Sequence, residues 1–390
     1  MQNSNDRLAK SIVDIPFSGI RKFFDIAAEM GDVISLSVGE PDFQTPENVR
    51  NAAIKSLNEG KTKYTSNLGM LELRHEIAAH IKRRHGVEYN PANQIVVTVG
   101  ASEGVDVSLR AIINPGDEVL VVEPCYVSYR PGIIMAGGVP VSIQTKAENQ
   151  FKLQPEELAA KITPRTKAIL LNYPTNPTGA IMEREDLAKL VPILLENNII
   201  VITDEIYGDL TYGGRKHVSI TEFPEMYSNT ILLNGFSKAY SMTGWRLAYA
   251  CGPEDIMQQF TKIHQYVIMS APTTSQYAGI EALSNCDPDI DAMREEYDKR
   301  RKLMLSGFRS LGMDCFEPFG AFYMFPSIKK SGFSSDDFCT KLLYENKVAV
   351  VPGNAFGECG EGFIRCSYAY SLESIEIALE RIEEFLKKHK

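Results

Sequence analysis

The chain has 390 residues, 44% of them hydrophobic and 23% charged, which is an ordinary composition for a globular protein. This length exceeds the size at which a single hydrophobic core stops growing, so we expect two domains. The formal net charge is −9, from 41 basic and 50 acidic residues, and this argues against a nucleic-acid partner or a membrane surface, since both require a basic face.

The positions of the cysteines and histidines argue against disulfide bonds and against a metal site. The seven cysteines include no CxxC pair, so we expect reduced thiols in a cytoplasmic protein. His75, His80 and His85 are five apart, so successive rings turn by roughly 140° around a helix and share no face for a metal. The first ten residues are polar, and no apolar run approaches the roughly 18 residues of a membrane span, so we expect neither a signal peptide nor a membrane anchor.

Two helices are expected before the first strand. Thr45-Pro46-Glu47 is typical of an N-cap followed by a first-turn proline and a first-turn acid, and it predicts a helix that ends near residue 58. A second helix is expected over residues 71–85.

Short apolar runs then alternate with amphipathic segments. Each run is rich in Val, Ile or Leu with little polar alternation, which is typical of strands buried on both faces. The runs span residues 95–99, 119–122, 139–143, 168–171, 199–203, 231–233 and 247–251, and the expected helices between them span 102–113, 127–135, 154–162 and 183–197. This alternation predicts an α/β fold with a mostly parallel seven-stranded sheet.

The pattern changes at about residue 287, so the best candidate for a domain boundary lies near Asn285. The expected elements are a charged helix over 290–311, strands at 321–325, 349–351 and 363–366, and helices over 335–345 and 372–387. This part of the chain is expected to form a smaller α+β domain.

Candidate ligand-binding residues stand at the carboxyl ends of predicted strands, where ligands bind in open α/β sheets. No GxxxxGK[ST] motif exists, and the glycines at 357, 360 and 362 lack the strand, turn and helix order of a dinucleotide site. Gly100-Ala101-Ser102-Glu103 joins a strand to a helix, and the free N–H groups of a helix start suit an anion. A plain helix cap has the same composition.

Three further motifs follow strands. Asn176-Pro-Thr-Gly179 is compatible with a simple turn. Asp204 ends an apolar strand, so its carboxylate is either a helix N-cap or the partner of a buried cation. Lys238 follows the run at 231–233 among small residues; a lone lysine is usually a solvated charge, but at such a site its pKa can be lowered and it can form a Schiff base.

Taken together, these motifs resemble those of class I/II aminotransferases, the fold-type I enzymes of pyridoxal 5′-phosphate (PLP). The segments that carry the likeness are Asn176-Pro-Thr-Gly179, Asp204-Glu-Ile-Tyr207, Ser237-Lys238-x7-Arg246, Ser35 to Phe43, Lys63-Tyr64-Thr65 with Gly69, and Phe363-Ile-Arg365-Cys-Ser367. They stand in the family's order and spacing from about residue 10 to 388. The likeness is greatest to the subgroup with Met242-Thr-Gly-Trp-Arg246 after the lysine, which includes aspartate, aromatic and N-acetyl-diaminopimelate aminotransferases.

The resemblance implies roles for individual residues. Lys238 would form the Schiff base with PLP and then move the proton between the substrate Cα and the cofactor C4′. Asp204 would keep the pyridine nitrogen protonated, and Asn176 and Tyr207 would hydrogen-bond the phenolic oxygen. The other implied contacts are Tyr126 stacked on the ring, Ala101, Ser102 and Arg246 at the phosphate, Tyr64 reaching that phosphate from the neighbouring subunit of a homodimer, and Arg365, assisted by the backbone of Gly39, at the substrate carboxylate.

Two positions depart from the pattern of many relatives. Gly235 stands where these relatives have a phosphate-binding serine, three residues before the lysine, and Ser237 is the expected replacement. Ser102 stands where some aspartate-selective members have a lysine, which favours aromatic or long-chain substrates over a strict dicarboxylate preference.

The family fold implies a large PLP-binding domain over residues 49–285 and a discontinuous small domain over 1–48 and 286–390. The implied reaction moves an amino group between an L-amino acid (aromatic, aspartate, glutamate or related) and a 2-oxo acid such as 2-oxoglutarate, in a ping-pong cycle through pyridoxamine phosphate. One alternative is a PLP-dependent C–S β-lyase, since the same lysine and aspartate serve both chemistries. A second alternative is a cofactor-binding regulator with an aminotransferase-like domain, but such regulators usually add a basic DNA-binding domain, for which this acidic chain has no room.

Overall fold

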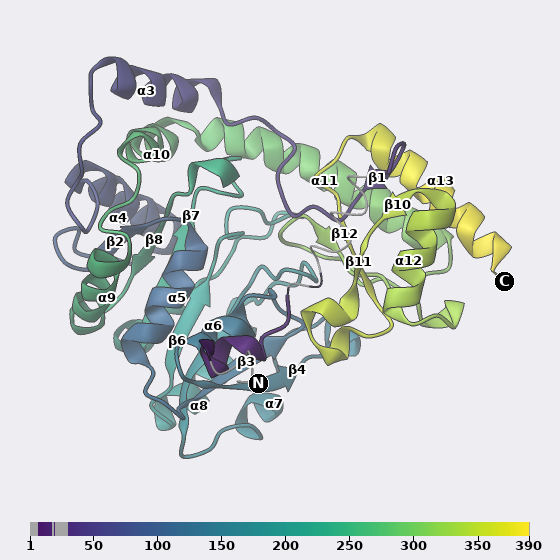
Figure 1. Ribbon diagram of the computed structural model, residues 1–390, viewed down its shortest axis with the longest axis horizontal. Helices are drawn as coiled ribbons and strands as arrows, with labels where there is room; N and C mark the ends of the chain where they lie inside the picture. Colours follow the sequence, from purple (N-terminus) through teal and green to yellow (C-terminus); the bar gives the residue numbers. More distant parts are fainter. Residues whose placement is uncertain (1–6, 18, 20–29, 390) are drawn as a thin grey trace.

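A computed structural model describes residues 7–17, 19 and 30–389 (Figure 1). Its main feature is a seven-stranded sheet in the order β2-β8-β7-β6-β5-β3-β4. The strands are β2 (Ile95–Thr98), β3 (Glu118–Glu123), β4 (Val139–Gln144), β5 (Thr166–Leu171), β6 (Ile200–Asp204), β7 (Thr230–Gly235) and β8 (Ala248–Cys251). Only β8 runs antiparallel to its neighbours, so the prediction of a mostly parallel seven-stranded sheet is confirmed.

Helices cover both faces of this sheet. On one face, Val119 and Val121 pack with α5 (Ala101–Ile112), α6 (Tyr129–Met135) and α9 (Glu254–Val267). On the other face, Leu120 and Val122 pack with α7 (Pro155–Ala159) and α8 (Arg184–Glu196). A third group of helices, formed by α3 (Glu47–Asn58), α4 (Leu71–His85) and α10 (Thr273–Asn285), packs against β2, β8 and β7 at one end of the sheet. Successive strand residues point to opposite faces, so burial on both faces explains the uninterrupted apolar runs.

A second hydrophobic core lies to one side of the sheet (Figure 1). Its elements are α11 (Asp287–Ser310), α12 (Ser335–Asn346), α13 (Leu372–Lys388), β1 (Ile34–Ser35), β9 (Tyr323–Met324), β10 (Val348–Ala349), β11 (Val351–Pro352) and β12 (Ile364–Ser367). Strand β1 pairs in parallel with β10, and Leu36 joins the core, so an N-terminal segment packs with the C-terminal part of the chain.

Three α-helices in the described part of the chain were not predicted from the sequence. The short α1 (Lys10–Val13) has no buried residue and therefore carries no apolar pattern. Helix α10 buries small residues such as Ala278, Gly279 and Ala282, which give little hydrophobic contrast. Helix α9 has a readable signal, because Met257, Phe260 and His264 recur at helical spacing on its buried face. No helix among the described residues is long and apolar enough to cross a membrane.

The predicted N-cap at Thr45 is wrong. Helix α3 starts at Glu47, with Pro46 in the cap position and no side-chain cap. The Thr45 hydroxyl donates instead to the backbone oxygen of Ser241 at 2.6 Å and accepts a hydrogen bond from Nε1 of Trp245 at 3.0 Å. The Thr45 hydroxyl therefore binds the loop after Lys238 and does not cap α3.

Candidate active site

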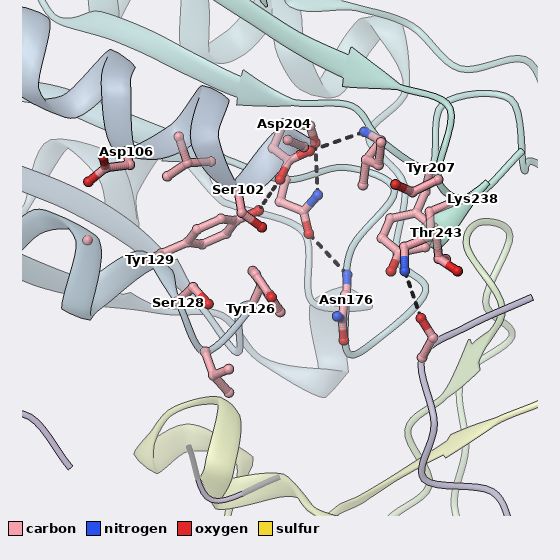
Figure 2. Close-up of a pocket in the computed structure, with 18 of the residues that line it drawn as sticks. Ser102, Asp106, Tyr126, Ser128, Tyr129, Asn176, Asp204, Tyr207, Lys238 and Thr243 are labelled. Carbon is pink, nitrogen blue, oxygen red and sulfur yellow. Dashed lines mark hydrogen bonds between the residues drawn. The ribbon is translucent and has the colours of Figure 1, made fainter. Parts of the chain in front are cut away.

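A cavity of about 930 Å³ lies where β2, β5, β6 and β7 end (Figure 2). These strand ends meet at one edge because the strands run in the same direction. The predicted site residues that line the cavity are Gly39, Ala101, Ser102, Tyr126, Asn176, Asp204, Tyr207, Ser237, Lys238, Arg246 and Arg365. Tyr64 lies elsewhere, with 82% of its surface exposed.

Asp204, the last residue of β6, is a buried carboxylate in the cavity wall. Its Oδ2 accepts a hydrogen bond from the Tyr129 hydroxyl at 2.8 Å, and its Oδ1 accepts one from the backbone N–H of Ile206 at 3.2 Å. Burial raises the pKa of Asp204, and the hydrogen bonds from Tyr129 and Ile206 oppose this rise. Such a carboxylate suits a buried cationic partner.

Lys238 follows the end of β7 and is partly buried in the cavity wall. Its Nζ donates to the backbone oxygen of Gly39 at 2.7 Å, so the N-terminal segment contacts the lysine directly. Burial lowers the pKa of Lys238 from 10.5 to about 8. The neutral amine is the form that attacks a carbonyl, so this environment favours Schiff-base chemistry.

Arg365 on β12 lines the side of the cavity that lies away from the seven-stranded sheet. Only 2% of its surface is exposed. Its Nη1 donates to Oδ1 of Asn176 at 3.0 Å and its Nη2 to the backbone oxygen of Ser37 at 2.5 Å. The guanidinium lies between the rings of Tyr323 and Phe356. Its buried Nε has no partner, and no acidic side chain of the described residues forms a salt bridge with Arg365. A buried guanidinium that has no acidic partner is suited to bind the carboxylate of a ligand.

The end of the cavity at α5 suits a phosphate group. Arg246 packs against Gly100, where an added Cβ would stand 2.5 Å from Nη2, so glycine is needed for this close approach. The first residues of α5, Ala101 and Ser102, line the same cavity as Arg246. Unpaired N–H groups at a helix start and an adjacent guanidinium both attract an anion.

These groups fit PLP. A phosphate site, a buried carboxylate for a ring nitrogen and a lysine of lowered pKa share one cavity with the aromatic side chain of Tyr126. A volume of about 930 Å³ is within the range of cofactor sites. The cavity therefore has room for PLP together with an amino acid.

The departure at Gly235 has a steric explanation. A Cβ at this position would stand 2.5 Å from Cβ and 2.7 Å from Cα of Ala248, the residue that faces it in the β7–β8 pair. A serine cannot fit there without movement of a strand. Ser237, by contrast, lines the cavity.

Asn172, Tyr129 and Tyr323 are among the cavity residues that were not predicted from the sequence. Asn172 donates to the backbone oxygen of Asp204 at 2.8 Å and accepts from the backbone N–H of Asn176 at 3.1 Å, so it joins two site segments. Its position directly after the apolar run at 168–171 is a signal that could have found it. The Tyr323 hydroxyl lies 2.8 Å from that of Tyr207, and Tyr323 does not stand out from its apolar neighbours in the sequence.

Comparisons with known proteins agree with this geometry. Residues 31–382 match the family model described as aminotransferase class I and II. The putative aminotransferase YugH of Bacillus subtilis is 47% identical over 381 residues, which cover 98% of each chain. The aspartate aminotransferase of Pyrococcus abyssi is 43% identical over 96% of each chain. The crystal structure of the aromatic aminotransferase from Pyrococcus horikoshii has a TM-score of 0.90 at 40% identity, covering 95% of this chain and 99% of its own.

The chain therefore belongs to the class I and II aminotransferase family. It has the aspartate-aminotransferase-like fold, its reaction is transamination, and its cofactor is PLP. The recognition made from the sequence motifs is confirmed.

Proposed function

We propose that this aminotransferase takes aromatic L-amino acids as its preferred donors and a 2-oxo acid such as 2-oxoglutarate as acceptor. The observation that supports the amino-acid site is Arg365, a buried guanidinium whose Nε has no partner and which lines the same cavity as Lys238 and Asp204. The α-carboxylate of the donor would bind this guanidinium through two hydrogen bonds.

The cavity lining favours an aromatic donor over aspartate or glutamate. Among the described lining residues the cations are Lys238, Arg246 and Arg365, and each already has a proposed partner. No further cation of this chain lines the cavity to bind a side-chain carboxylate, and Ser102 stands where a lysine would do so. Tyr323, whose ring lies against the Arg365 guanidinium, provides a ring surface instead, and the Pyrococcus horikoshii relative is named an aromatic aminotransferase.

The proposed residue roles follow from these positions. When bound, PLP supplies the electron sink for the substrate carbanion. Lys238 carries the proton to and from the substrate Cα, and Asp204 holds the proton on the pyridine nitrogen. Asn176 and Tyr207 hydrogen-bond the phenolic oxygen, while Arg246, Ser237 and the start of α5 hold the phosphate. Movement of a small domain (residues 1–48 and 286–390) against a large domain (49–285) would exclude water from this site.

We further propose a cytoplasmic homodimer in which Tyr64 reaches the phosphate of the partner subunit. Tyr64 belongs to an exposed apolar surface with Tyr266, Val267, Ile268 and Met269. The two segments are joined by bonds from Asn67 to Met269 and from Thr273 to Lys63. Exposed apolar surface of this kind is common at subunit contacts. The seven unpaired cysteines suit a reducing compartment.

A spectral half-reaction tests the donor assignment. Purified protein with PLP would be mixed with Tyr, Phe, Asp, Glu or a diaminopimelate derivative, without acceptor, and followed by absorbance. We expect conversion to the pyridoxamine form fastest with Tyr and Phe. Faster conversion with Asp would contradict the aromatic preference. Accumulation of pyruvate and ammonia from a β-substituted amino acid, while the band persists, would indicate lyase activity instead.

The dimer has a separate test. Sedimentation of wild-type protein should give twice the mass of the 43.5 kDa chain. Tyr64→Phe should leave this mass unchanged but weaken PLP retention, because it removes only the hydroxyl that would reach the phosphate. An active monomer would show the proposal to be wrong.

A further inference from the structure

Tyr129 connects Asp204 and Tyr126, two of the residues proposed to hold the PLP ring. It is the first residue of α6 and only 2% exposed. Its hydroxyl donates to Oδ2 of Asp204 at 2.8 Å, as Figure 2 shows. Its ring makes an edge contact with Tyr126, at a centroid distance of 5.7 Å. Tyr129 therefore contacts the carboxylate proposed for the ring nitrogen and the aromatic side chain proposed for the ring face.

The hydroxyl of Tyr129 acts as a fixed donor. Burial and the neighbouring Asp204 carboxylate hold the pKa of Tyr129 well above its usual range, so its proton stays in place. The second carboxylate oxygen of Asp204 accepts from the backbone of Ile206. Each carboxylate oxygen can accept more than one hydrogen bond, so both retain capacity for a pyridinium N–H.

We propose that Tyr129 is a positioning residue that keeps Asp204 ionised and oriented toward the ring nitrogen. This inference rests on the proposed role of Asp204 and adds a second residue to it. A hydrogen bond to a charged acceptor in a buried site stabilises the charged form. Loss of the Tyr129 hydroxyl would favour protonated Asp204 and so weaken the protonation of the ring nitrogen.

Other charged groups also act on Asp204, and they define the background of the test. Its sequence neighbour Glu205 raises the pKa of Asp204, whereas Lys238 lowers it. Glu205 lies in a separate set of bonds with His217, Thr203 and Ser219, so Tyr129→Phe leaves these contacts in place. The other titratable groups that act on the pKa of Tyr129, besides Asp204, are Cys125 and Tyr126.

The test compares Tyr129→Phe with a matched loss of a buried hydroxyl. The Tyr173 hydroxyl bonds only backbone atoms of Leu153 and Phe151 and does not line the cavity, so Tyr173→Phe is the control. We expect Tyr129→Phe to bind PLP on Lys238 but to lower the rate of the amino-acid half-reaction by about ten- to a hundredfold. The pH midpoint of the lysine-bound absorbance band should rise, because a less protonated ring nitrogen places less positive charge near the lysine nitrogen.

Two further measurements separate positioning from general stability. In an Asp204→Asn background, Tyr129→Phe should cause little additional change in the band midpoint, since the acceptor charge is already gone. Replacement of Tyr129 by 3-fluorotyrosine keeps the shape of the side chain and strengthens the donor, so the midpoint should move down.

The outcomes are distinct. A Tyr129→Phe protein with the midpoint and rate of Tyr173→Phe would overturn the positioning role, as would an unchanged midpoint with 3-fluorotyrosine. Absence of the lysine-bound band in the wild-type protein with PLP would instead overturn the proposed role of Lys238.

Discussion

Arg365 and Asn176, which are 189 positions apart, meet through a hydrogen bond of 3.0 Å from Nη1 to Oδ1. This bond joins β12 to the turn after β5, and the backbone oxygen of Ser37 holds Nη2 from a third segment. Two of the guanidinium nitrogens are therefore fixed by the protein, while Nε is left without a partner. The orientation of Arg365 is set before any substrate binds.

Arg365→Lys should weaken amino-acid binding much more than PLP binding. A lysine keeps the positive charge but loses the planar fork that grips a carboxylate with two hydrogen bonds. Loss of a hydrogen bond to a charged group costs about 1.5–3 kcal/mol, so kcat/KM for the donor should fall at least about tenfold. Steady-state kinetics measure this fall, with the exposed Arg110→Lys as control. Unchanged saturation by the donor would mean that another group binds the carboxylate.

The lowered pKa of Lys238 predicts how cofactor capture depends on pH. An amine of pKa about 8 loses its proton at lower pH than a free lysine of pKa 10.5, so more of it is neutral at any pH between these values. The rate at which the apoprotein takes up PLP should rise about tenfold per pH unit below 8 and level off above it. Stopped-flow absorbance gives this profile. A rise that continues to pH 10 would contradict the effect of burial.

Lys238→Ala checks the same residue directly. This variant should lack the lysine-bound absorbance band, and borohydride should not fix PLP to it. A variant that still couples to PLP on reduction would exclude Lys238 as the anchor.

Asp204→Asn should bind PLP yet turn over slowly. The amide keeps the shape of the side chain but cannot stabilise a protonated ring nitrogen, so the rate should fall by about two to three orders of magnitude. Single-turnover kinetics with a saturating donor measure the chemical step. A near-normal rate would remove Asp204 from the electron-sink role.

Gly235→Ser should destabilise the protein although many relatives have serine at this position. Its Cβ would stand 2.7 Å from the backbone Cα of Ala248, and overpacking of this kind costs about 1–3 kcal/mol. Urea denaturation gives the free energy of unfolding. Ser237→Ala should instead leave stability unchanged and weaken PLP binding by about tenfold. Normal stability with tighter PLP binding in Gly235→Ser would reverse this interpretation.

The sequence predicts the sheet well because its strands, apart from the edge strand β4, are buried on both faces. A run such as Val119 to Val122 can then be recognised without knowledge of its partners. Polar residues that follow such runs, including Asp204 and Asn176, stand at the strand ends and so predict the site. Both predictions rest on neighbouring residues in the sequence, namely an apolar run and the polar residues that follow it, and the fold places these residues in a buried strand and at its end.

Residues whose role depends on a distant partner are harder to predict. The hydroxyls of Tyr129 and Tyr323 are identified only by what they contact, Asp204 and Tyr207 respectively. Thr45 has the local pattern of a cap, yet its hydroxyl bonds Ser241 across 196 positions. Tyr64 lies outside the cavity of its own chain, and its proposed role requires a second subunit.

Trp245, whose indole Nε1 donates a hydrogen bond to Thr45, can report cofactor binding through its fluorescence. Trp245 is the one tryptophan in the sequence, it is only partly buried, and it directly precedes Arg246 at the proposed phosphate site. Emission excited at the red edge of the protein band therefore comes from a single fluorophore beside the cofactor. Quenching on PLP addition, and recovery when the cofactor leaves, would follow occupancy in real time without a label.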